Sequence, residues 1–84
     1  MNFNVDWHPK ASKNLSKLPK ELIKRILNKV DEVREDPFRY LEHFEVKNVY
    51  KLRIGDYRAL IDVDFQNKLL YIQVFDKRGR VYKR

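Results

Sequence analysis

Residues 50–58, Y-K-L-R-I-G-D-Y-R, constrain the fold more than any other segment, because they read as two strands joined by a two-residue turn. With Gly55-Asp56 as the turn, the pairing follows: Ile54 with Tyr57, Arg53 with Arg58, Leu52 with Ala59 and Lys51 with Leu60. Side chains alternate between the faces of a sheet, so three cations share one face, namely Lys51, Arg53 and Arg58. Like charges opposite one another in a sheet repel, and this face therefore predicts a site for phosphate rather than a gain in stability.

The remaining periodicity predicts a single α+β domain over residues 1–84. Phe3, Val5 and Trp7 alternate with polar residues as in a short strand, and proline suits a first helical turn, so a helix begins near Pro9. The expected elements are a strand near residues 3–7, helices at 9–18 and 20–34, a connection at 38–45, and strands at 46–54, 57–65 and 68–75. This β-α-α-β-β-β order predicts two layers, in which a helical hairpin covers one face of a sheet that ends in a three-stranded antiparallel meander. The opposite face stays open.

The register of the last two strands extends this face assignment. If Gln66-Asn67 is also a two-residue loop, the pairs are Ile61 with Ile72, Leu60 with Gln73 and Arg58 with Phe75. The open face then also receives Tyr71, Gln73, Phe75 and, beyond the strand, Lys77. Cations beside aromatic rings suit single-stranded RNA, because charge holds the backbone and rings stack on bases. Alternatively, Phe75 covers an edge of the core.

Composition narrows the class of protein. The chain has 84 residues, no cysteine and a formal net charge of +7, and five basic residues but no acid lie between Lys77 and Arg84. This suits a polyanionic target or an acidic protein partner, although a solvated charged surface would look the same. Without cysteines, a signal peptide or an apolar run long enough to cross a bilayer, a soluble cytoplasmic protein that does not contact membranes is expected.

Several kinds of catalytic site are not expected from this sequence. It offers no cysteine nucleophile, no glycine-rich phosphate loop and no plausible Ser-His-Asp arrangement. Its two histidines, His8 and His43, would have to converge to act as an acid–base pair. Asp62 and Asp64 are simpler as partners of nearby cations than as metal ligands, so we expect no metal and no cofactor.

The hairpin residues and the basic tail ending Arg80-Val81-Tyr82 resemble the RelE/ParE superfamily of toxins from prokaryotic toxin–antitoxin pairs, over nearly the whole chain. The resemblance implies a RelE-like fold. In the RelE-like branch, it implies a ribosome-dependent endoribonuclease that inhibits translation by cleaving messenger RNA in the ribosomal A site. A ribose 2′-hydroxyl attacks the adjacent phosphate and the 5′-oxygen leaves, with basic residues in place of histidines and no metal.

The resemblance also implies roles for individual residues. The catalytic set would be Lys51, Arg53, Arg58, Arg78 and Tyr82. Lys51 is the better general base, because neighbouring cations favour its neutral amine, whereas an arginine essentially never gives up its proton. The planar guanidinium groups of Arg58 and Arg78 suit a phosphorane. Tyr82 would stack on a base or orient the hydroxyl, or else anchor the terminus. The RNA-binding set would be Lys77, Arg80, Tyr71, Phe75 and Lys83, and Lys77 is a reserve candidate for the acid.

Two other functions remain open at this stage. A ParE-like toxin shares the fold but inhibits DNA gyrase, and a non-enzymatic RNA-binding module would use the same cations only to dock phosphates. For a toxin, the resemblance implies two partners, a 70S ribosome with its messenger RNA and a RelB-like acidic antitoxin that wraps the toxin, with a toxin–antitoxin heterotetramer as one form of the complex. The antitoxin would act by covering Lys51, Arg53 and Arg58 or by making the toxin too bulky for the ribosome.

Overall fold

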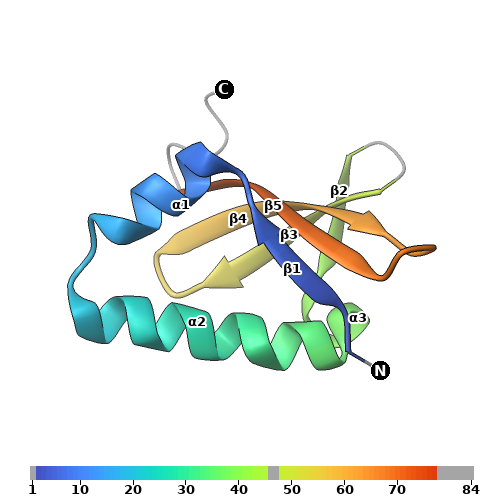
Figure 1. Cartoon of the computed structure of the whole chain (residues 1–84), viewed down its shortest axis with the longest axis horizontal. Coiled ribbons are helices and arrows are strands. Elements are labelled where there is room, and N and C mark those ends of the chain that lie inside the picture. Colours follow the sequence, from blue (N-terminus) through green and yellow to red (C-terminus); the bar gives the residue numbers. More distant parts are fainter. Residues whose placement is uncertain (1, 46–47, 78–84) are drawn as a thin grey trace.

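The computed structural model of the chain describes residues 2–45 and 48–77. It has the predicted α+β architecture, with two more short elements than the sequence indicated. In chain order the elements are β1 (Asn4–Trp7), α1 (Pro9–Ser16), α2 (Lys20–Glu35), α3 (Pro37–Tyr40), β2 (Glu42–Glu45), β3 (Val49–Ile54), β4 (Tyr57–Asp64) and β5 (Leu69–Lys77) (Figure 1).

Prolines set where the helices begin. Pro9 occupies the first turn of α1, and the imidazole Nδ1 of His8 caps this helix by accepting a hydrogen bond from the backbone N–H of Lys10, at 3.1 Å. Pro19 precedes α2, and the carbonyl of Pro19 accepts from the backbone N–H groups of Leu22 and Ile23. Both helices start where the sequence predicted, because proline fits a first helical turn and, at Pro19, cannot continue the helix before it.

The described strands form one sheet in the order β1-β5-β4-β3-β2. All four predicted pairs of the β3–β4 hairpin are confirmed, from Ile54 with Tyr57 to Lys51 with Leu60. Gly55 has a φ of +58° and is the only one of the two turn residues with a positive φ, as in a type II′ turn, where glycine leads. The sequence did not indicate that β1 pairs in parallel with β5, from Asn4 opposite Leu69 to Trp7 opposite Ile72.

A bulge in β5 overturns part of the predicted face assignment. Ile61 pairs with Ile72 as expected, but the register then shifts by one residue, so that Leu60 pairs with Val74 rather than Gln73 and Arg58 with Asp76 rather than Phe75. A one-residue shift moves every following side chain to the other face. Phe75 and Lys77 therefore lie on the helix side, opposite Ala59 and Tyr57, and their predicted outward placement was wrong.

Residues 38–45 are not the plain connection that the sequence suggested. They contribute most of α3 and the edge strand β2, which pairs with β3 through Glu42 opposite Lys51 and His43 opposite Tyr50. The predicted strand at 46–54 is β3 from Val49 onward, and residues 46 and 47 lie outside the described residues. The β4–β5 connection also differs from the predicted two-residue loop at Gln66-Asn67. It is four residues long, because β4 ends at Asp64 and β5 begins at Leu69, and Lys68 within it has a φ of +51°.

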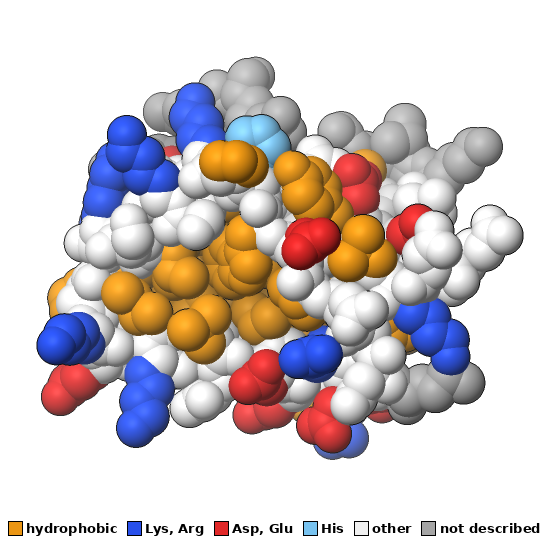
Figure 2. All heavy atoms as spheres, in the orientation of Figure 1, with side chains coloured by type: hydrophobic (Ala, Val, Ile, Leu, Met, Phe, Trp, Pro, Cys, Tyr) orange, Lys and Arg blue, Asp and Glu red, His pale blue; other side chains and the backbone are white. Residues whose placement is uncertain are grey.

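The core lies between the helices and one face of the sheet. Ala11 and Leu15 of α1 and Ile26, Val30 and Val33 of α2 are buried against strand residues, with Leu52, Ile61, Val63, Leu70, Ile72 and Phe75 among the most buried. Figure 2 shows hydrophobic side chains still visible between α1 and α2, and Leu27 is 41% exposed on α2. None of the described helices is long and apolar enough to cross a membrane.

Candidate functional site

The predicted cationic cluster is present on the sheet face that points away from the helices, here called the outer face. Arg53 is directly opposite Arg58 and Lys51 is directly opposite Leu60, so the three cations share this face of β3 and β4. Asp62, which pairs with Tyr71, lies further along the same face. The outer face therefore runs from a cationic end at the β3–β4 hairpin to an acidic end at the β4–β5 connection.

Lys51 has an acidic partner that the sequence did not reveal. Strand β2 places Glu42 directly opposite Lys51, and the ammonium Nζ lies 3.6 Å from a carboxylate oxygen of Glu42. The Lys51 side chain is 27% exposed and that of Glu42 59% exposed, so the pair is near solvent. Lys51 is thus not surrounded by cations alone, which was the premise for expecting it to act as the base.

Arg58 is buried, with only 5% of its surface exposed. Its Nη1 donates hydrogen bonds of 2.9 Å to the carbonyl oxygens of Gly55 and Tyr57. The guanidinium group therefore holds the turn of the hairpin on which it lies. The register also places an acid, Asp76, directly opposite Arg58. Arg53, by contrast, is exposed.

The bulge in β5 also determines the partner of Asp62. The amide Nε2 of Gln73 donates to the carboxylate of Asp62 across the two strands. In the connection, the side chain of Asn67 donates to Asp64 at 2.9 Å and its backbone N–H donates at 3.0 Å. These hydrogen bonds lower the pKa of Asp64 below its ordinary value, the side-chain bond contributing most. Within the described chain both aspartates thus bind amides and not the cations that the sequence suggested.

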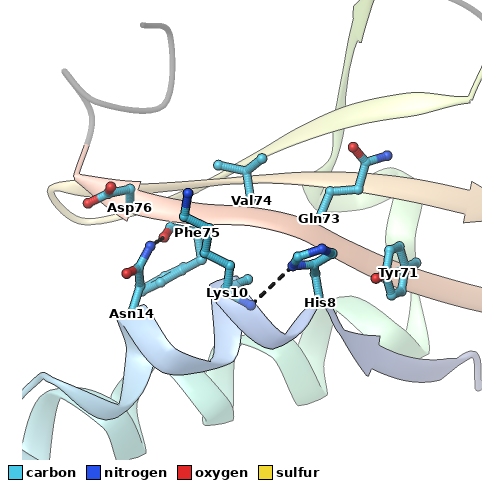
Figure 3. A pocket seen from close by; sticks show the side chains of 9 residues that line it. His8, Lys10, Asn14, Tyr71, Gln73, Val74, Phe75 and Asp76 are labelled. Atoms are coloured by element: carbon cyan, nitrogen blue, oxygen red, sulfur yellow. Dashed lines mark hydrogen bonds between the residues drawn. The ribbon is translucent and has the colours of Figure 1, made fainter. Parts of the chain in front are cut away.

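A hollow of about 460 Å³ lies between α1 and β5 and includes Tyr71, one of the predicted RNA contacts. Figure 3 shows the imidazole of His8 between Lys10 and Tyr71, and Asn14 donating to the carbonyl of Phe75. The rings of His8 and Tyr71 meet edge to face at 6.3 Å. His43 lies on β2, at the opposite edge of the sheet, against Tyr50. The two histidines therefore do not converge.

The structure thus brings Lys51, Arg53 and Arg58 together and leaves Tyr71 two strands from Lys51. Phe75 is 1% exposed, with its ring stacked on Tyr57 at 5.4 Å and edge-on to Trp7 at 5.9 Å. A ring buried in this way is part of the core and offers no face to a base. Lys77 is exposed and lines a small hollow with Asn14 of α1 and Lys17, which directly follows that helix. Arg78, Arg80, Tyr82 and Lys83 lie outside the described residues.

Sequence reasoning missed the two acids that border the cations. Glu42 was missed because E-H-F-E is too short to establish a strand, although its acid was visible in the sequence. Asp76 was missed because the predicted register paired Arg58 with Phe75, and the bulge that brings Asp76 opposite Arg58 depends on tertiary packing and leaves no fixed sequence pattern. In the described residues, no group of three His, Asp or Glu side chains forms a possible metal site.

A family model and a curated relative both match this chain over nearly its whole length, and both are named as toxins. Residues 5–82 match the sequence model of the family described as ParE toxin of type II toxin-antitoxin system, parDE. The toxin candidate RelE1 of Methanocaldococcus jannaschii is 28% identical over 89 residues, which cover 99% of this chain and 98% of that protein.

Solved structures agree on the fold. The RelE–RelB complex of Pyrococcus horikoshii matches at a TM-score of 0.78 and 28% identity, covering 95% of this chain and 99% of the other. The toxin–antitoxin complex RelBE2 of Mycobacterium tuberculosis matches at a TM-score of 0.79 and 22% identity, covering 93% of this chain and 100% of the other. The likeness in each case extends over nearly the whole described fold.

Proposed function

This chain belongs to the ParE toxin family of type II toxin–antitoxin systems, and from that premise we propose that it is a ribosome-dependent endoribonuclease that cleaves messenger RNA in the ribosomal A site. The observation that carries the proposal is the gathering of Lys51, Arg53 and Arg58 on the outer face of one hairpin. Full-length similarity to proteins named RelE supports this choice within the superfamily.

In the proposed reaction a ribose 2′-hydroxyl attacks the neighbouring phosphorus, and the 5′-oxygen of the next nucleotide leaves. A new bond forms between the 2′-oxygen and phosphorus as the bond to the 5′-oxygen breaks, so the products carry a 2′,3′-cyclic phosphate and a 5′-hydroxyl. Lys51 would accept the hydroxyl proton as a neutral amine, after it has released its own proton to solvent and its contact with Glu42 has been broken. The leaving 5′-oxygen would take up a proton from water or a general acid. Arg53 and Arg58 would stabilise the additional negative charge on the phosphorane.

The roles proposed for the residues after Lys77 come from the sequence resemblance alone. Arg78 would hold the phosphate beside Arg58, and Tyr82 would stack on a base or orient the attacking hydroxyl. Tyr71, Arg80 and Lys83 would contact RNA on either side of the cleaved bond. Lys77 lies on the helix side of β5, so it is a weaker candidate for the acid than its place in the sequence indicated.

One observation favours a second function, inhibition of DNA gyrase by a ParE-like toxin. Arg58 is buried, and its Nη1 is occupied by the hairpin's own carbonyl groups. An arginine with that role is useful to any toxin of this fold, whether or not it cleaves RNA. The family whose sequence model matches this chain is also the one named after the ParE toxin.

A primer-extension assay of a defined message on programmed 70S ribosomes tests both functions. Wild-type protein should cut within the A-site codon, and Arg53→Ala, Arg58→Ala and Arg78→Ala should lose the cuts. Lys20→Ala, an exposed cation at the start of α2, is the matched control and should cut normally. An intact message, together with inhibition of gyrase supercoiling by the same preparation, would replace the nuclease with the ParE-like function.

The expected protein partner is an acidic antitoxin of the RelB type. Complexes named RelE–RelB and RelBE2 among the relatives support this proposal, and so do the apolar side chains that remain visible between α1 and α2. A partner helix there would bury apolar surface, and an acidic segment would neutralise part of the net charge of +7. Co-purification with the product of an adjacent reading frame, and loss of ribosome cleavage in that complex, would be the expected result.

A further inference from the structure

A second group of cations surrounds a hollow on the other side of the hairpin. This hollow has a volume of about 410 Å³ and lies between α2 and the β3–β4 turn. It is lined by Arg25, Asn28, Lys29 and Glu32 of α2 and by Arg53, Ile54 and Gly55 of the hairpin. Here it is called the α2 hollow. Arg53 belongs both to this hollow and to the outer face.

Helix geometry explains why the α2 residues meet at this place. Residues 25, 28, 29 and 32 are spaced by three and four, so they follow one stripe along the helix. On the other wall, Gly55 has no side chain, and a Cβ built at that position would meet nothing within 4 Å. No side chain of Gly55 therefore occupies this part of the wall of the hollow.

The charges in the α2 hollow are not balanced. The lining residues include three cations, Arg25, Lys29 and Arg53, and one acid, Glu32, a net charge of +2, although the strand register directs the Arg53 side chain to the outer face. Glu32 is already used by Lys29, whose Nζ lies 3.5 Å from it. A surface pair of this kind is worth only about 0–1 kcal/mol, so it does not explain why three cations are gathered around one opening.

The lining suits phosphate better than an acidic peptide. Arg25 carries a planar guanidinium group that can bind two phosphate oxygens, and the Asn28 amide adds a neutral donor. A docked peptide normally anchors apolar side chains in pockets, whereas Ile54 is the single apolar residue in this lining. The ammonium of Lys29 also lies 4.6 Å above the ring centre of Tyr40, which limits its freedom before a ligand arrives.

We propose that the α2 hollow is a phosphate-binding subsite for the backbone of single-stranded RNA, with Arg53 linking it to the outer face. This rests on the proposed RNA substrate. An RNA strand that leaves the outer face over the hairpin reaches Arg25 and Lys29 next. These two residues touch no reacting atom, so their contribution is affinity and strand direction rather than chemistry.

The test is fluorescence anisotropy with a labelled single-stranded RNA whose sugars are 2′-O-methylated, so that no cleavage can occur. The subsite variant is Arg25→Ala with Lys29→Ala. The matched control is Lys20→Ala with Lys24→Ala, which removes the same charge from exposed positions of the same helix. The subsite variant should bind about tenfold more weakly than the control, and its slope of log K against log salt should fall by about 1.4, as for two phosphates at about 0.7 each.

Three results would overturn the subsite. The two double variants could lose affinity equally, which would indicate only an effect of net charge. Wild-type protein could fail to bind the RNA at all. Alternatively, polyglutamate binding could depend on Arg25 and Lys29 while RNA binding does not, which would assign the hollow to an acidic protein segment. Thermal unfolding of each variant by circular dichroism checks the fold, and Arg25→Gln alone serves if the double variant is unstable.

Competition and cleavage assays separate this proposal from related ones. Inorganic phosphate that displaces the RNA from wild-type protein but not from the subsite variant supports a phosphate contact in the hollow. Wild-type protein could cleave normally in the A site while the subsite variant keeps its RNA affinity. That result would overturn the proposed subsite and support the proposed nuclease function. RNA affinity could instead depend on Arg25 and Lys29 while no cleavage is seen. That result would support the proposed subsite and overturn the proposed nuclease function.

Discussion

At the scale of single residues, Arg58 has two tasks, because the guanidinium group proposed to stabilise a phosphorane also donates to the carbonyl oxygens of Gly55 and Tyr57. Its burial means that these bonds are made where water competes poorly. A loss of activity on substitution would therefore mix two effects. Only a stability measurement beside the activity measurement separates them.

Arg58→Ala should lower the free energy of unfolding by about 1–3 kcal/mol, because the hairpin loses two hydrogen bonds that a buried guanidinium group donates to the carbonyl oxygens of Gly55 and Tyr57. Urea denaturation followed by circular dichroism measures this change. Arg53→Ala is the control, since the side chain is exposed, and should change stability by less than about 0.5 kcal/mol. Equal stability of the two variants would show that the turn does not depend on Arg58.

Asp64 should titrate below the ordinary aspartate value of 3.8, because the side chain and backbone of Asn67 donate to its charged form. A carboxyl-detected NMR titration should show its pKa moving back up in Asn67→Ala and remaining low in Gln66→Ala. Because the folded pKa is depressed, the added stability is present above the ordinary aspartate pKa and is lost as pH falls through the folded value. An unchanged pKa in Asn67→Ala would contradict this account.

At the scale of elements, the β3–β4 hairpin was predictable and the β4–β5 hairpin only in part. Gly55-Asp56 fixes a register locally, so the sequence placed Lys51, Arg53 and Arg58 on one face correctly. The second hairpin followed the same logic only as far as Ile61 opposite Ile72, where the bulge begins. A bulge is stabilised by packing that is distant in sequence, here of Phe75 against Trp7 and Tyr57. Phe75 and Lys77, two of the four β5 residues predicted on the open face, lie on the helix side for that reason.

The bulge makes a direct prediction about Phe75. Phe75→Ala should cost about 3–5 kcal/mol of stability, as for other buried phenylalanines, and Phe75→Leu should cost less and stay folded. Tyr71→Ala, at a partly buried position four residues earlier, is the comparison and should cost less than Phe75→Ala. Chemical denaturation measures all three. If Phe75→Leu keeps full stability but loses RNA affinity, the ring faces the ligand after all.

At the scale of the whole molecule, β5 connects the two ends of the described chain. It lies between β1 and β4, and its pairing with β1 joins residues as distant in sequence as Asn4 and Leu69. Strand β2, at the far edge, is paired only on one side and with an irregular register. Stability should therefore be greatest at the centre of the sheet and decrease toward both edges.

Hydrogen exchange measured by NMR should show this gradient. The amides of β4 and of the central part of β5 should exchange only through global unfolding, because both strands have neighbours on both sides. The amides of β2 should exchange faster, through local opening that leaves the remaining sheet intact. Uniform protection from β2 to β5 would mean that the edge strand unfolds only with the whole domain.

The position of β5 also has a consequence for the synthesis of the protein. A growing chain reaches Leu69 only after β1, both long helices and β4 have been made, so until then β1 has no neighbour in the sheet. The sheet that carries the cationic hairpin cannot be completed while β5 is missing. The sheet therefore acquires its folded form only after β5 has been made, rather than step by step as each element emerges.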